Sequence, residues 1–99
     1  MRLDQIIASS CRQRMLLALA KVRKTNVTQL VRMINSTYNQ VNRNLVILEN
    51  EKIIKTERLG YLRIVELNVE NPKTLALLKA LELLDKPIPN SQTSTSNQR

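Results

Sequence analysis

Three segments of the chain place apolar residues at the spacing of an α-helix. Residues 10–23, 27–34 and 37–51 repeat apolar side chains every three or four positions, as one buried helix face requires. A short apolar turn over residues 3–7 precedes them. Each stripe begins near a residue that favours a helix start. Glutamine follows that residue three positions later, in the pattern called a capping box. These capping residues are Ser10, Asn26 and Thr37.

The second and third predicted helices are joined closely enough to form a helix-turn-helix. Only Asn35 and Ser36 separate them, and asparagine tolerates the left-handed backbone conformation of a tight turn. The helical spacing of apolar residues ends after these two helices. Residues 53–67 are rich in strand-forming residues and are interrupted by the one glycine of the chain, Gly60. This pattern predicts a β-hairpin with Gly60 at its tip.

A last helix is predicted over residues 72–86. Asn71 is a capping residue and Pro72 suits the first helical position. Eight of the ten residues 75–84 are leucine or alanine. Their apolar arc exceeds about 200°, whereas a helix that covers its own core needs roughly 100°. We expect the remaining apolar surface of this helix to be buried against a second copy of the chain. The alternative is a helix buried entirely within its own domain. The expected dimer interface consists of Leu75, Leu77, Leu78, Leu81 and Leu84.

The length of the chain, 99 residues, allows a single domain, which the predicted elements assign to residues 1–86. Residues 87–99 are dominated by Pro, Ser, Thr, Asn and Gln, so we expect a disordered tail there. No apolar run approaches the roughly 20 residues of a membrane span, and the first residues lack the basic and then apolar pattern of an export signal. We therefore expect a cytoplasmic protein with no membrane partner.

The charge of the chain is strongly positive and unevenly distributed. Sixteen Lys and Arg residues outnumber eight Asp and Glu, which gives a formal net charge of +8. Residues 1–58 carry eleven basic and four acidic residues, whereas residues 59–86 carry four of each. This asymmetry favours a polyanionic partner for the first part of the chain; the alternative is charge that serves solubility alone.

Missing residue types exclude several classes of chemistry. The sequence has no histidine, one cysteine and one glycine. It therefore lacks a histidine general base, the ligands of a zinc finger and the glycine-rich loop of a nucleotide site. We expect no enzymatic activity, no cofactor and no metal. Cys11 falls on the apolar side of the first predicted helix, where we interpret it as a small buried hydrophobe; a redox-sensitive thiol is the alternative.

The order of the elements and one stretch of sequence resemble the winged helix-turn-helix transcriptional regulators. Residues 26–54, NVTQLVRMINSTYNQVNRNLVILENEKII, are similar to the pattern of ArsR-like, MarR-like and small archaeal regulators. The resemblance implies an α+β, mostly α fold with a three-helix core, a β-hairpin wing and a C-terminal dimerisation helix. Asn35 and Lys52 depart from the pattern, because these proteins often have glycine there. Metal sensing is not implied, since that branch uses Cys and His ligands that this chain lacks.

The third predicted helix carries an outward face that suits recognition of DNA bases. If Val41, Leu45 and Leu48 face the core, a step of about 100° per residue turns the polar residues outward. A helix fits the major groove, where Asn and Gln pair with adenine and Arg with guanine. The alternative is an ordinary solvated face. The expected contacts are Ser36, Thr37, Asn39, Gln40, Asn42 and Arg43.

Two further sets of residues are expected to contact the DNA. Phosphate contacts near the start of the second helix are expected from Lys24, Thr25, Thr28 and Gln29. The wing, whose tip commonly reaches a minor groove in proteins of this fold, contributes Lys55, Arg58, Tyr61 and Arg63. For each single Lys or Arg the alternative is a solvated side chain.

These residues predict a sequence-specific regulator that binds double-stranded DNA, with a homodimeric, nucleoid-associated repressor as the leading interpretation. Two other functions compete with it: an architectural, chromatin-like DNA-binding protein and a winged-helix protein-interaction module. The amide and arginine face favours the regulator, because packaging of DNA needs only Lys and Arg.

Overall fold

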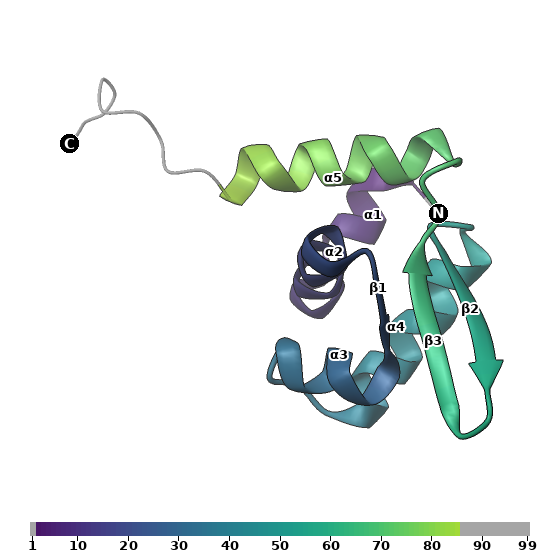
Figure 1. The fold of residues 1–99 in the computed structure, drawn as a ribbon. Helices are drawn as coiled ribbons and strands as arrows, with labels where there is room; N and C mark the ends of the chain where they lie inside the picture. The colour runs from purple at the N-terminus through teal and green to yellow at the C-terminus, as the bar shows by residue number, and fades with distance from the viewer. Residues whose placement is uncertain (1, 86–99) are drawn as a thin grey trace.

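The computed structural model describes residues 2–85 and confirms the predicted winged helix-turn-helix, a mostly helical α+β fold (Figure 1). The helices are α1 (Leu3–Ile7), α2 (Ser10–Val22), α3 (Val27–Met33), α4 (Tyr38–Asn50) and α5 (Pro72–Asp85). The strands are β1 (Lys24–Asn26), β2 (Ile54–Leu59) and β3 (Leu62–Leu67). Of these elements, β1 is the one that the sequence pattern does not predict. The predicted tail, residues 87–99, lies outside the described residues.

Side-chain caps set the starts of the three central helices. The Asn26 side chain accepts from the backbone nitrogen of Gln29 at 2.9 Å, and Thr37 accepts from that of Gln40 at 3.2 Å. Both predicted caps are confirmed. The cap of α2 is Ser9, which accepts from the backbone nitrogen of Arg12 at 3.3 Å. The prediction of Ser10 was therefore wrong by one residue, because adjacent serines look alike in a capping pattern.

The turn between α3 and α4 has the left-handed residue that the sequence predicts. Asn35 has a φ of 53°, and its backbone nitrogen donates to the carbonyl of Arg32 at 3.2 Å. The next nitrogen, of Ser36, reaches the carbonyl of Val31 at 3.1 Å. These bonds satisfy carbonyls at the end of α3, so the chain reverses at once into α4.

The sheet contains three antiparallel strands in the order β1-β3-β2. Gly60, with a φ of 60°, is the first of two residues that join the paired Leu59 and Leu62. Glycine at this place is the signature of a type II′ hairpin turn. Side chains alternate along β2, so Arg58 shares the helix-facing side with buried Ile54, while Lys55 lies on the other side. The hairpin projects beyond the helices as the wing (Figure 1).

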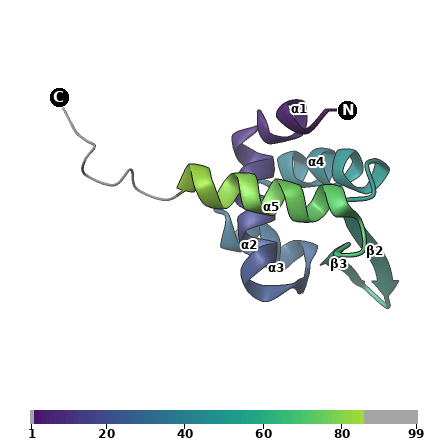
Figure 2. The same ribbon diagram turned by 90° about the horizontal axis from the view of Figure 1, so that it is seen from above.

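The core is aliphatic and draws on every helix and the hairpin. α5 packs across α1 and α2 (Figures 1 and 2). Leu77 and Leu81 on α5 are 0% and 1% exposed within the single chain, and Leu78 packs against the same core. Leu77 and Leu81 therefore have no surface left for a partner. The expectation is corrected for these two residues alone, because the helix first has to cover its own domain. The predicted contact of Leu84 lies outside the side chains that the structure describes.

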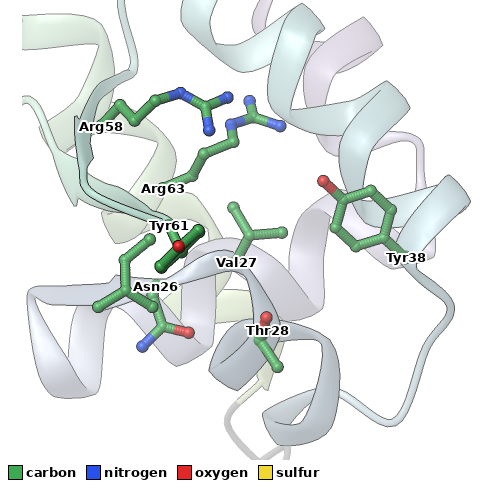
Figure 3. Close-up of a pocket in the computed structure, with 8 residues that line it drawn as sticks. Asn26, Val27, Thr28, Tyr38, Arg58, Tyr61 and Arg63 are labelled. Carbon is green, nitrogen blue, oxygen red and sulfur yellow. The ribbon is translucent and has the colours of Figure 1, made fainter.

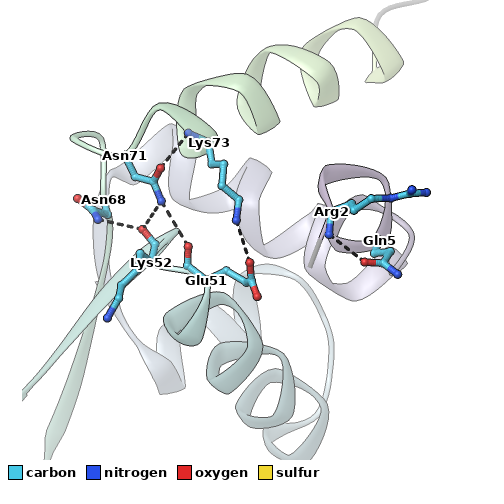
Figure 4. A network of polar contacts seen from close by, with 7 residues as sticks. All are labelled: Arg2, Gln5, Glu51, Lys52, Asn68, Asn71 and Lys73. Atoms are coloured by element: carbon cyan, nitrogen blue, oxygen red, sulfur yellow. Dashed lines mark hydrogen bonds and ion pairs between the residues drawn. The ribbon is translucent and has the colours of Figure 1, made fainter.

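A polar network fixes the corner between α4, the wing and α5 (Figure 4). Lys52 takes a φ of 63°, a left-handed conformation that glycine adopts more readily than lysine. Its carbonyl accepts from the side-chain amides of Asn68 at 2.9 Å and Asn71 at 3.0 Å. The Asn71 side-chain oxygen accepts from the backbone nitrogen of Lys73 at 2.9 Å and so caps α5. One side chain thus joins the end of α4 to the start of α5.

An ion pair supports the same corner. Lys73 Nζ lies 2.9 Å from Glu51 Oε1. The hydrogen bond from Lys73 lowers the pKa of the Glu51 carboxyl below its ordinary value of 4.5. A carboxyl with a lowered pKa in the folded state stabilises the fold above pH 4.5 and loses that contribution as the pH falls below it.

We predict that Asn71→Ala lowers the free energy of unfolding by about 2 kcal/mol, since both the cap of α5 and the amide bonds to α4 are lost. Asn71→Ser is the matched control, because serine keeps the cap and removes only the amide donors. It should lose about 1 kcal/mol. Urea unfolding followed by circular dichroism measures both values. Equal losses in the two variants would show that the cap contributes nothing, and no loss in Asn71→Ser would show the same of the amide bonds to the Lys52 carbonyl.

Candidate nucleic-acid interface

The outward face of α4 presents two polar side chains that the fold does not use. Val41, Leu45 and Leu48 are completely buried and face the core, as the sequence analysis assumes. Asn39 and Arg43 are both exposed and lie one turn apart on the opposite side. Within residues 2–85, neither side chain takes part in a hydrogen bond or an ion pair. Both are therefore free to bind a ligand.

Other polar residues on α4 are engaged within the chain. Ser36 Oγ donates to Gln40 Oε1 at 3.0 Å. Asn44 Nδ2 donates to the Gln40 carbonyl at 2.8 Å, and its side-chain oxygen accepts from Arg12 Nη1 at 2.8 Å. The sequence pattern places Asn44 at the edge of the outward face and gives no sign of Arg12, which reaches it from α2, 32 positions earlier. These amides hold the helix in place as well as lining its surface.

Asn42 connects α4 to the wing. Its side-chain oxygen accepts from Arg63 Nη1 at 2.6 Å, across 21 positions of sequence. Both residues are half-buried, so this contact is partly shielded from water. Both are expected as DNA contacts from the sequence, but their positions do not predict that they meet. Their bond fixes the position of the wing relative to the helix that carries Asn39 and Arg43.

The predicted wing residues divide between the two sides of the hairpin. Arg58 and Arg63 are directly opposite each other on β2 and β3, on the side that faces the helices. Lys55 lies on the outer side, beside Glu57 and Glu66, which carry the opposite charge. Tyr61 is fully exposed at the tip. The structure therefore brings three of the four predicted wing residues, Arg58, Tyr61 and Arg63, to one hollow and separates Lys55 from them.

The residues predicted near the start of α3 lie on two elements. Lys24 and Thr25 are in β1, where Lys24 is exposed and Thr25 is half-buried. Thr28 and Gln29 are exposed in the first turn of α3. Lys24 and Thr25 lie beside the base of the wing, because β1 pairs with β3, opposite Glu66 and Val65. Thr28 lines the hollow described next, whereas Gln29 does not.

A hollow of about 110 Å³ lies between the helix-turn-helix and the wing (Figure 3). It is open to solvent, and none of the described residues that line it is acidic. The Tyr38 side chain, at the start of α4, approaches it from the side opposite the wing (Figure 3). The lining residues are Asn26, Val27, Thr28, Tyr38, Arg58, Tyr61, Leu62 and Arg63.

Other kinds of site are not found in the part of the chain that the structure describes. Among residues 2–85, no three Cys, His, Asp or Glu side chains gather as metal ligands would. No helix in this range has the length and apolar character needed to cross a membrane. Cys11 is buried, with its sulfur 3.9 Å from the sulfur of Met15 and 4.0 Å from the hydroxyl oxygen of Ser36.

Comparison with known proteins supports this description at the level of structure. No protein-family model and no curated protein matches the sequence. Among solved structures, the antimony-specific transcriptional repressor AntR is 27% identical, with a TM-score of 0.70 over 82% of this chain and 68% of that one. The transcriptional repressor PagR of Bacillus anthracis is 25% identical, with a TM-score of 0.65 over 84% of this chain and 88% of that one. The transcriptional repressor BigR from Xylella fastidiosa shares the fold, with a TM-score of 0.73 at 19% identity over 86% of this chain and 84% of that one.

The likenesses to AntR and PagR cover 82% and 84% of this chain, whose elements form a three-helix core with a helix-turn-helix and a wing. The chain is therefore a winged helix-turn-helix protein of the kind that serves as a transcriptional regulator.

Proposed function

We propose that this chain is a sequence-specific, double-stranded DNA-binding protein that acts as a homodimeric repressor of transcription. The observation that carries the proposal is the outward face of α4, where Asn39 and Arg43 are exposed and have no partner within residues 2–85. A regulator of this kind works on chromosomal DNA in the cytoplasm and is associated with the nucleoid.

The chemistry of that face suits base recognition. An α-helix enters the major groove of B-form DNA with its side chains toward the base edges. The Arg43 guanidinium matches the two acceptors of guanine, and the Asn39 amide matches the donor and acceptor of adenine. Gln40, Asn42 and Asn44 already have partners in the chain, so we assign base recognition chiefly to Asn39 and Arg43.

The distribution of charge supports a duplex as the partner. Residues 1–58, which include α4 and all but the last residue of β2, carry eleven basic and four acidic residues. Cations near the phosphates displace counterions from DNA, so affinity falls as salt rises. If about six phosphates are contacted, the affinity should drop by about three decades between 50 and 200 mM salt.

An apolar stripe on α5 supports the dimer. Leu75 and Leu83 are 53% and 66% exposed, and Ala76 is exposed beside them. These residues lie on the side of α5 that faces away from buried Leu77 and Leu81. Large aliphatic side chains gathered on one helix are typical of an interface. Two copies joined there present two α4 helices, which suits a near-palindromic target with half-sites about 10 bp apart.

The similar solved proteins AntR and PagR are both described as transcriptional repressors. A small DNA-binding domain that occupies a promoter represses by excluding other proteins from it. This is the basis for proposing repression by this chain.

We expect Asn39→Ala and Arg43→Ala each to weaken binding to the preferred duplex by about 1–3 kcal/mol, because each removes one base-reading side chain. The duplex is first selected from a random pool, and affinity is then measured by fluorescence anisotropy with and without random competitor DNA. Lys79→Ala, which removes an exposed cation from α5, is the charge-matched control for Arg43→Ala and should change affinity little. A preferred-to-random affinity ratio near one in the unmodified protein would favour architectural binding instead.

Leu75→Asp should convert the dimer to a monomer, because an unpaired carboxylate would be buried at the interface. Sedimentation equilibrium should give twice the chain mass of 11.4 kDa for the unmodified protein and the single mass for the variant. Leu59→Asp is the matched control, since Leu59 is also 53% exposed but lies on the wing. A dimer that survives Leu75→Asp would place the interface elsewhere.

A further inference from the structure

Two arginines face the same hollow without any acidic residue to balance them. Arg58 and Arg63 form a cross-strand pair, with their backbones directly opposite each other. Like charges at such positions repel and destabilise a hairpin. Within residues 2–85, neither arginine has an ion pair, and Arg58 has no side-chain hydrogen bond. The described chain therefore pairs neither arginine with an acidic side chain that would offset their repulsion.

The position of one of these arginines is fixed by the fold. Arg63 Nη1 donates to Asn42 Oδ1 at 2.6 Å, which holds its guanidinium between the wing and α4. Figure 3 shows the guanidinium of Arg58 beside it, on the same side of the wing. A guanidinium has five N–H donors, so this one bond leaves most of the donors of Arg63 available. Two forks of donors thus lie next to each other at one edge of the hollow.

Neutral hydroxyl donors complete the lining. The Tyr38 hydroxyl points into the hollow from α4 (Figure 3) and has no hydrogen-bond partner among the described residues. Thr28 also lines the hollow and its hydroxyl has no bond within residues 2–85. The space of about 110 Å³ exceeds several-fold the roughly 10–15 Å³ that one water requires. Arginine pairs of this kind bind tetrahedral oxyanions, since the guanidinium fork matches two oxygens of a phosphate.

We infer that this hollow is a seat for a single phosphate group, held by Arg58 and Arg63 together and by the Tyr38 hydroxyl. The phosphate is one of the DNA backbone, and to that extent the inference rests on the proposed function. A phosphate in this seat contacts α4 and the wing at once, so the wing and the helix-turn-helix meet the same point of the duplex. In this arrangement Arg58 and Arg63 act on the phosphate backbone and not in a minor groove.

The test replaces the phosphates of the selected duplex one at a time by neutral methylphosphonates. We expect the unmodified protein to lose roughly tenfold or more in affinity at one phosphate of each half-site, the size of a charged hydrogen-bonded contact. In Arg58→Gln and Arg63→Gln, replacing that same phosphate should lower the affinity much less, because each variant already lacks the contact. Lys55→Gln, which removes an equal charge from the outer side of the same hairpin, should keep the full loss.

A second arm tests the seat without DNA. Nitrogen-15 NMR of the free protein is recorded against inorganic phosphate, with chloride at matched ionic strength as reference. One outcome is that phosphate causes saturable shifts around the hollow, that these disappear in Arg58→Gln, and that the arginine variants do not change the methylphosphonate losses. The hollow would then still bind phosphate, but its ligand would be a free phosphoanion and not the DNA backbone. Failure of the unmodified protein to bind any duplex would refute the proposed function, and the phosphate titration would then decide on the seat alone. The inference would be overturned if the two arginine variants changed the methylphosphonate loss at different phosphates. It would also be overturned if neither the methylphosphonate series nor the phosphate titration gave a response.

Discussion

The orientation of α4 depends on the burial of three aliphatic side chains, Val41, Leu45 and Leu48. All three are completely buried against the core. Full burial of such a side chain contributes roughly 1.5–3 kcal/mol, so exposing the three together would cost about 5–9 kcal/mol. That cost is comparable with the whole stability of a small domain, about 5–15 kcal/mol. Rotation of the helix is therefore prohibited, and Asn39 and Arg43 on its opposite side have to face outward.

The wing depends on the same helix at both of its ends. At the base, the left-handed Lys52 turns the chain out of α4, and Asn68 and Asn71 hold its carbonyl. Nearer the tip, Arg63 bonds to Asn42 on α4. These two connections make the hairpin an extension of α4 rather than a separate arm. The hollow with its paired arginines is a consequence, because it exists only where the hairpin and the helix-turn-helix are held at this distance.

The sequence predicts the helices and the hairpin well because their signals are local. Apolar spacing and caps three residues apart identify α3 and α4, and Gly60 identifies the hairpin turn. β1 was not predicted, since a strand of three residues has no period and is defined by its pairing with β3, whose residues follow about 40 positions later. The sequence pattern also could not distinguish Ser9 from Ser10 as the cap of α2, because the cap depends on which backbone nitrogen each hydroxyl reaches.

The candidate site was predictable only as a set of residues. Asn42 and Asn39 look equivalent in the sequence, yet Asn42 is bonded to Arg63 and Asn39 to nothing in the described chain. On α5, eight of the ten residues 75–84 are leucine or alanine, so composition alone could not say that Leu77 is buried while Leu75 is exposed. Long-range contacts decide both cases, and these follow from the packing of the whole domain.

Binding of duplex DNA by the outward face of α4 can be followed residue by residue, by backbone NMR of the labelled protein with the selected duplex. We expect the largest shift changes over residues 37–44 and 58–63, with those of α5 small by comparison. Changes confined to α5, or to the outer side of the sheet, would contradict it.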